Sequence, residues 1–419
     1  MGDTTQQKKN SEKNPLWKYP WRYRESFFIS AELLIIGFAF ELFTKGKGVE
    51  PIKWPLNLII GISFILILLS LRVLFRKHPI IKWFSSIPAA ISSLSLFTLM
   101  VLLLGFLSQN DQQASILIRS LGLSHVKNSW PFVIAQIYLL TTLGFVTIRR
   151  ASPLTRKNLG FLLNHAGLWI ALSTATLGAG DLKRWYINIY EDKDFVPHAY
   201  DDNRNLHELP FAVKLIDFDI EEYNPKIGIA EWETGNLLNA EGLNPVTIEK
   251  GLNVNFSDWD ITIEEFLHSA ITENGKYILD DESGAAPAAL ITSVNRVSGD
   301  TVFSWISCGS FILKSHYISL NEKYFLAMIR PQAKKFSSLV EIKSDKNIID
   351  TVTIEVNKPH KIMGWRLYQL NYDQDMGKWS NLSVLEVVKD PWLPIVYIGI
   401  FLVLAGAFYI FWIGKDIKE

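Results

Sequence analysis

Six apolar runs along the chain are long enough to cross a lipid bilayer, which takes about 20 predominantly apolar residues per helix. A polar stretch separates the fifth run from the sixth. The pattern predicts an integral membrane protein with six transmembrane helices and one large domain outside the bilayer. The runs cover roughly 26–44, 56–75, 84–107, 131–148, 159–178 and 392–413. The predicted parts are a polar N-terminal segment (1–25), five spans (26–179), the polar domain (180–389), and a final span with a short tail (390–419).

The polar domain has the alternating, β-branched pattern of short strands. Residues 348–356 (IIDTVTIEV) are the clearest example, and polar clusters such as 280–284 separate the segments. Many short strands divided by turn residues predict an antiparallel sandwich or barrel. We therefore expect a β-rich, sandwich-like domain. Further strands are predicted within 211–220, 259–267, 301–307, 324–330 and 365–372.

Charge is distributed unevenly although the chain as a whole is neutral, with 42 Lys and Arg against 42 Asp and Glu. Residues 180–389 contain 21 basic and 32 acidic residues, a net charge of −11, so the remaining chain has a net charge of +11. Basic residues are concentrated before the first span and in alternate loops, which places those loops in the cytoplasm. We expect both termini in the cytoplasm, the acidic domain outside it, and the protein in the inner (plasma) membrane. The basic residues are Lys8, Lys9, Lys13, Lys18, Arg22, Arg24, Arg76, Lys77, Lys82, Arg149, Arg150, Arg156, Lys157, Lys415 and Lys418.

Composition excludes several classes of protein. A hydrophobic content of 48% is too high for a disordered chain. The single cysteine, Cys308, excludes an internal disulfide framework, a Cys-only metal cluster and dithiol exchange within this chain. The acidic domain has no basic excess for binding nucleic acid. No P-loop, dinucleotide fingerprint or Ser-His-Asp pattern is present.

The fifth span contains the most informative polar residues, Asn164 and His165, with Gly160 and Gly167 nearby. Ionisable groups inside a bilayer are costly, so each marks a candidate site. A neutral imidazole can ligate haem iron through one nitrogen while a partner holds the other. The glycines would let another helix or a flat macrocycle approach closely. The alternative is a histidine that forms a hydrogen bond between helices.

Other polar residues in or near the spans have structural explanations. We expect Glu41, near the outer end of the first span, to reach the membrane interface, and Glu32 to lie deeper and pair with a neighbouring span or be protonated. Small hydroxyl residues in the third span predict close helix packing. Histidines outside the spans show no metal-ligand spacing. The span serines are Ser85, Ser86, Ser92, Ser93 and Ser95, and the histidines are His125, His198, His207, His268, His316 and His360.

Short motifs in the second half of the chain resemble the ResB (CcsB) family. They are Leu209-Pro210-Phe211 and Asp217-Phe218, then 356–359 (VNKP), 364–369 (GWRLYQ) with Tyr372-Asp373, 389–391 (KDP), and 393–399 (LPIVYIG) leading into the last span. The segment 164–167 (NHAG) is similar to the family's H-x-G element. The resemblance covers about residues 159–413.

The resemblance implies a role in system II cytochrome c biogenesis. The family works with a CcsA-type membrane protein to move haem across the membrane and deliver it to apocytochrome c. By this resemblance His165 would be a haem axial ligand, with Asn164 and Gly167 beside it. The chain would then be an accessory subunit of a holocytochrome c synthase (haem lyase), and its partners would be the CcsA-type protein, apocytochrome c and membrane lipid.

Two departures from the family pattern bear on this prediction. The family commonly has three spans before its soluble domain, whereas five are predicted here, and no haem role transfers to His360. The Trp-rich motif of the CcsA-type partner is absent, so a separate partner is required. The alternative function is a membrane-anchored scaffold or ligand-binding protein that does not handle haem.

Overall fold

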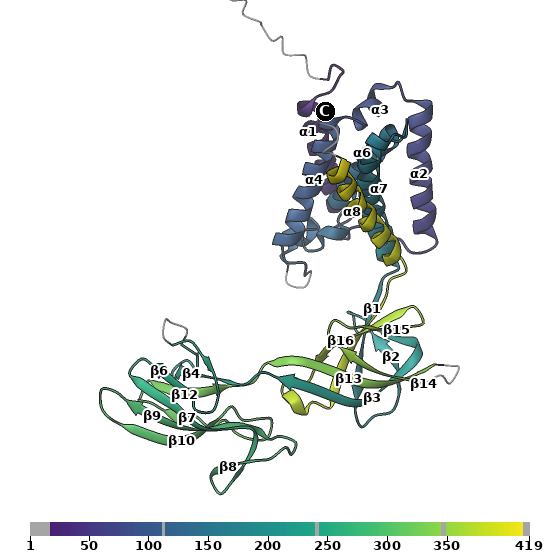
Figure 1. The fold of residues 1–419 in the computed structure, drawn as a ribbon. Helices are drawn as coiled ribbons and strands as arrows, with labels where there is room; N and C mark the ends of the chain where they lie inside the picture. The colour runs from purple at the N-terminus through teal and green to yellow at the C-terminus, as the bar shows by residue number, and fades with distance from the viewer. Residues whose placement is uncertain (1–16, 111–113, 239–242, 345–348, 414–419) are drawn as a thin grey trace, which may run out of the picture. The chain divides into compact units, whose positions relative to one another are not determined.

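The computed structural model describes residues 17–110, 114–238, 243–344 and 349–413. The chain forms two compact units, a helical unit from residues 1–182 and 390–419 and a β unit from residues 183–389 (Figure 1).

The helical unit contains five helices in the described ranges that are long and apolar enough to cross a membrane. They indicate a multi-pass membrane protein. These helices are α1 (Tyr23–Phe43), α2 (Leu56–Leu74), α4 (Ile87–Phe106), α6 (Trp130–Arg150) and α8 (Leu393–Ile413). The shorter elements are α3 (Pro79–Phe84), α5 (Ile116–Ser120), η1 (Val126–Asn128) and η2 (Gly178–Gly180).

The predicted fifth span forms helix α7 (Arg156–Leu177), which has 22 residues but is not among the five sufficiently apolar helices. Arg156, Asn158, Asn164 and His165 lower its apolar content. Within the described ranges, length and composition therefore support five spans rather than the six expected.

Glycines allow α7 and α8 to pack in backbone contact. A Cβ atom added at Gly167 would lie 2.6 Å from the carbonyl oxygen of Gly399, and one added at Gly406 would lie 2.8 Å from the carbonyl oxygen of Gly160. The two glycine pairs hold the antiparallel helices together because small residues permit close van der Waals contact in lipid. We call this contact the α7–α8 seam.

Hydroxyl groups join α4 to its neighbours. Ser92 shares a hydrogen bond of 2.8 Å with the hydroxyl of Tyr138, and Ser93 shares one of 2.8 Å with Thr142 on the same helix, α6. Ser30 of α1 donates to the carbonyl oxygen of Ser92 at 3.1 Å. The packing role predicted for the serines is confirmed for Ser92 and Ser93.

The β unit begins and ends in one eight-stranded antiparallel sheet that curls into a nearly closed barrel (Figure 1). Its strand order is β14-β13-β3-β2-β1-β17-β16-β15, and β14 also lies against β16. A core that includes Ile187, Leu215, Val340 and Leu385 fills it. The strands are β1 (Lys183–Tyr190), β2 (Val196–Tyr200), β3 (Leu206–Glu222), β13 (Ala333–Ser344), β14 (Ile349–Glu355), β15 (His360–Ile362), β16 (Trp365–Tyr372) and β17 (Leu382–Lys389), and η3 (Gly377–Trp379) precedes β17.

A second lobe lies between β3 and β13 in the sequence and consists of two smaller sheets. Residues from both sheets, including Ile229, Ile261, Ile291 and Leu326, form one core. One sheet has the order β11-β12-β4-β5, and the other has the order β10-β9-β7-β6 with β8 paired to β7. The strands are β4 (Lys226–Glu231), β5 (Val246–Thr247), β6 (Asn253–Phe256), β7 (Trp259–Glu273), β8 (Lys276–Leu279), β9 (Ala286–Asn295), β10 (Thr301–Ser307), β11 (Ile318–Ser319) and β12 (Tyr324–Ile329).

The antiparallel β prediction is confirmed, and each of the six predicted segments contains a strand in the described part of the chain. Residue 348 of the first predicted segment lies outside the described residues. The sandwich-like expectation applies only to the second lobe, because the strands that start and finish the unit form the barrel-like sheet. A sandwich and a barrel have the same alternating sequence pattern, since in both folds one face of each strand is buried.

Candidate functional site

His165 lies in a groove between α4, α6 and α7, which we call the α4–α6–α7 groove. Its volume is about 450 Å³. This lies within the range of about 300–1,000 Å³ typical of small-molecule sites. Apart from His165, the polar lining residues are Thr98 and Thr142. The apolar lining consists of Ala90, Leu94, Phe97, Val101, Leu139, Leu143, Val146, Leu168 and Leu172.

The imidazole of His165 is held in one orientation by its own helix. Its Nδ1 atom lies 3.0 Å from the carbonyl oxygen of Phe161. A carbonyl oxygen only accepts hydrogen bonds, so Nδ1 carries the proton and Nε2 keeps a lone pair. The Phe161 ring stacks on the imidazole with centroids 3.6 Å apart. Within the described ranges, Nε2 has no hydrogen-bond partner.

This arrangement is suited to metal ligation by a neutral histidine. Metal-binding histidines usually donate their second ring N–H to a carbonyl or carboxylate, which fixes both tautomer and ring orientation. The apolar groove walls would accommodate a flat aromatic macrocycle. His165 is the one metal-ligating side chain among the described residues that line the groove, so a second axial ligand would have to come from elsewhere.

Asn164 and Gly167 face α8 instead of the groove. The Asn164 Nδ2 atom donates at 3.5 Å to the carbonyl oxygen of Val403, and Gly167 belongs to the α7–α8 seam. Of the three predicted cofactor-binding residues, only His165 lines the groove. The helical period explains this separation. Asn164 and Gly167 are three residues apart and share a face of α7, whereas His165 points about 100° away from Asn164.

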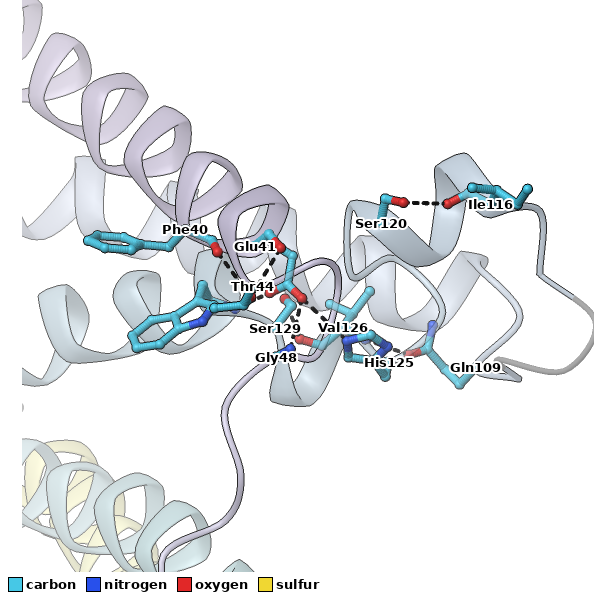
Figure 2. Close-up of polar contacts among 11 residues, drawn as sticks. Phe40, Glu41, Thr44, Gly48, Gln109, Ile116, Ser120, His125, Val126 and Ser129 are labelled. Atoms are coloured by element: carbon cyan, nitrogen blue, oxygen red, sulfur yellow. Dashed lines mark hydrogen bonds and ion pairs between the residues drawn. The ribbon is translucent and has the colours of Figure 1, made fainter.

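Glu41, which we expect near the outer end of the first span, is buried within the chain (Figure 2). Its side chain is fully inaccessible to solvent. One carboxylate oxygen accepts the Gly48 N–H at 3.0 Å and lies 3.5 Å from His125 Nε2, and the other accepts the Trp130 N–H at 2.8 Å. The loop after α1 turns back over the carboxylate, which satisfies backbone donors at the start of α6.

Glu32 lies on the exposed face of α1. In the part of the chain that the structure describes, it has no hydrogen bond or ion pair, so the expected pairing with a neighbouring span within this chain is not observed. Its neighbours on the same face, Phe28, Ile35 and Ile36, are exposed as well.

Asp181, which is partly buried, links three helices through contacts that the sequence did not reveal. Its carboxylate accepts hydrogen bonds from the Trp54 backbone at 2.8 Å, from Asn57 Nδ2 at 2.7 Å and from Trp392 Nε1 at 2.7 Å. Burial alone would raise the pKa of Asp181, but these three donors together hold the pKa below its ordinary value. Asp181 therefore joins the start of α2, the end of α7 and the start of α8.

The remaining histidines and the cysteine do not form a metal site among the described residues. His207 stacks on Trp185 and its Nε2 atom lies 3.0 Å from Asp201. His360 Nε2 lies 3.2 Å from Asp350. Burial raises the pKa of the Cys308 thiol to about 11, so the thiol stays protonated at neutral pH and unreactive.

No protein-family model and no curated protein matches this chain.

Proposed function

We propose that this protein is a haem-handling membrane subunit of a system II cytochrome c synthase, of the ResB type. It would help to move haem across the membrane and deliver it to apocytochrome c, together with a CcsA-type partner. In this role haem is cargo, and the chain itself is an accessory subunit of the haem lyase.

The observation that carries the proposal is the state of His165. Its Nδ1–H is donated to the Phe161 carbonyl oxygen, and its Nε2 atom has no described partner at the edge of an apolar groove of about 450 Å³. His165 is partly buried, and a polar atom within a membrane span that has no partner is costly, so a free lone pair beside an apolar groove is the property expected of a ligand site. The resemblance of residues 164–167 to the H-x-G element points to the same residue.

In the proposed topology, α7 is a sixth span of the inner membrane, and both termini lie in the cytoplasm. Contacts support this alternation of helices. Glu41 at the end of α1 binds the start of α6, and Asn57 near the start of α2 donates to the Leu177 carbonyl oxygen at the end of α7. Trp392 before α8 binds Asp181. These ends would face outward with the β unit, and the opposite end has Arg149 and Arg150, as expected of a cytoplasmic side.

A membrane partner is part of the proposal. The groove offers a single metal ligand, so a CcsA-type protein would supply the second. An exposed Glu32 supports the same conclusion, because ionisable groups within spans almost always face protein or a water-filled cavity. A partner helix with a hydrogen-bond donor at that depth would cover it.

The test is co-expression of the chain with a CcsA-type partner and an apocytochrome. The purified complex should show a haem absorption band that His165→Gly removes or weakens strongly, and added imidazole should restore it. Leu168→Ala, a groove residue without ligand atoms, is the matched control and should keep the band position. A haem-free complex, or a His165→Gly variant that matures cytochrome normally, would refute the proposal.

A second candidate, a scaffold or ligand-binding protein without haem, is favoured by one feature of the β unit. A cleft of about 550 Å³ lies where the chain crosses between the two lobes, and it is lined by polar and charged residues such as Lys226, Arg330 and Glu222. This candidate predicts a protein that contains no haem and a phenotype that depends on Lys226 and Arg330 but not on His165.

A further inference from the structure

A cation lies directly beside the stacked rings of the groove. The Arg150 guanidinium carbon is 5.4 Å from the centroid of the Phe161 ring. The same ring stacks on the His165 imidazole, with centroids 3.6 Å apart. Phe161 of α7 therefore contacts both the guanidinium of Arg150 and the imidazole of His165.

Helical spacing places Arg150 at the end of the groove. Val146 lines the groove, and Arg150 is four residues further along α6 on the same helix face. Phe161 is four residues before His165 on α7. The two side chains that meet at the end of the groove, Arg150 and Phe161, are thus each one helical turn away from a lining residue.

Arg150 has no acidic partner in the described ranges. The neighbouring Arg149 interacts electrostatically with Arg150 and has the same charge. The segment that links α6 to α7, residues 151–155, contains no acidic residue. An uncompensated arginine that is held over an aromatic ring keeps its five N–H donors available for a carboxylate.

We propose that Arg150 binds an acidic group of the ligand whose metal is held by His165. The ligand class is a flat apolar metal macrocycle with carboxylates at one edge, as in haem with its propionates. The macrocycle would lie in the apolar groove, and its carboxylate edge would point toward the end of α6. This inference rests on the proposed function and adds a residue that decides which macrocycles bind.

The experiment compares haemin with haemin dimethyl ester, which has the same iron and ring but no free carboxylates. The purified full-length protein in detergent is titrated with each compound, and absorption reports both affinity and iron ligation. We expect the wild-type protein to bind haemin about tenfold more tightly than the ester, since charge-assisted hydrogen bonds are about twice as strong as neutral ones. Arg150→Gln should abolish this preference, keep the affinity for the ester and leave the band position unchanged.

Arg149→Gln is the matched control, because it removes the same charge from the neighbouring position of α6 and should retain the preference for haemin. Equal binding of both compounds by the wild-type protein would overturn the inference while leaving the proposed function standing. The inference would also be overturned if Arg149→Gln abolished the preference for haemin to the same extent. It would be overturned as well if Arg150→Gln weakened the binding of haemin and of its dimethyl ester equally. If neither compound binds to the wild-type protein, the inference fails, and the proposed function is then decided by the haem band of the complex with its CcsA-type partner.

Discussion

Two polar sites of the helical unit, Glu41 and His165, differ in how completely their atoms are bonded. Both oxygens of Glu41 accept backbone N–H groups, and one of them faces His125. His165 commits one nitrogen to its own helix and presents the other to the α4–α6–α7 groove. The first site is closed by its own chain, and the second stays open.

The difference shows that the role of an ionisable residue in a membrane unit is indicated by its bonding partners more than by its presence in the sequence. A carboxylate that accepts hydrogen bonds on both oxygens and is inaccessible to solvent stabilises the fold and is closed to a ligand. An imidazole with an available lone pair contributes little to stability and can bind a metal. Substitutions at closed contacts should therefore destabilise the protein, whereas substitution at the open site should affect ligand binding instead.

The largest effect is expected for Glu41→Ala. It leaves two partly buried backbone donors without acceptors and removes the group opposite His125, which together should cost about 3 kcal/mol of unfolding free energy. Chemical unfolding in detergent measures this cost. Glu32→Ala, the loss of an exposed carboxylate on the same helix, should change the unfolding free energy by less than about 0.5 kcal/mol. Similar costs for both variants would contradict the distinction.

Gly167→Ala should have the second largest effect. The new methyl group would meet the backbone of Gly399 and Val403 at 2.6–2.7 Å, so the α7–α8 seam must open. We expect a loss of about 2 kcal/mol, the usual magnitude for overpacking. Gly105→Ala is the matched control, since a Cβ there meets no atom within 4 Å. It should be neutral or stabilising by up to about 1 kcal/mol because alanine is the better helix former. Thermal unfolding of the two variants compares them directly.

Asp181→Asn should have a moderate effect that depends on pH. The folded-state pKa of Asp181 lies below its ordinary value, because three donors outweigh the effect of burial. The ionised carboxylate therefore stabilises the fold at every pH above the unfolded value of about 3.9. We expect the unfolding free energy of the wild-type protein to exceed that of the variant by about 1 kcal/mol from pH 8 to pH 5. The difference should shrink only as the pH falls below about 4 and through the folded pKa. If the difference in unfolding free energy disappeared already between pH 7 and pH 5, the folded-state pKa of Asp181 would not lie below its ordinary value. Unfolding curves across this pH range test it.

The smallest effect on stability is expected for His165→Ala. The side chain is half-buried, and its one hydrogen bond goes to a carbonyl oxygen within its own helix. We expect a loss of less than about 1 kcal/mol together with loss of the haem band. A loss of more than about 2 kcal/mol would instead identify His165 as a packing residue. Unfolding and absorption measured on the same preparation separate the two outcomes.

Much of the fold could be predicted from the sequence because it follows from hydrophobic periodicity. Five of the predicted spans are apolar helices, and strands such as β10 and β16 have the predicted bounds. The barrel-like closure could not be predicted, since alternation fixes which face of a strand is buried but not which strands pair. The bonding of Glu41 depends on a loop that turns back over it, and no periodic pattern encodes that turn.

The candidate site was predicted in part. The sequence identified His165, but it grouped Asn164 and Gly167 with the same site. A signal for the α7–α8 seam was present: Gly160 and Gly167 are seven residues apart, as are Gly399 and Gly406. Equal spacing on two apolar helices indicates a shared packing face. The groove itself requires three helices, and its lining from α4 and α6 could be identified only from their packing.

The second lobe of the β unit has the topology of a single insertion. Glu222 of β3 and Ala333 of β13 are register partners, and the intervening segment leaves and returns at that pair, where the Tyr223 N–H donates to the Gln332 carbonyl oxygen at 2.9 Å. The two lobes have separate hydrophobic cores. A tight turn between Glu222 and Ala333 would therefore be enough to join β3 to β13. The inserted lobe is then a module whose further ties to the barrel-like sheet include the contact at η3, where Trp379 Nε1 donates to the Ala285 carbonyl oxygen at 2.9 Å. Away from such contacts, its length and surface can change without disturbing the strands that connect to the membrane helices.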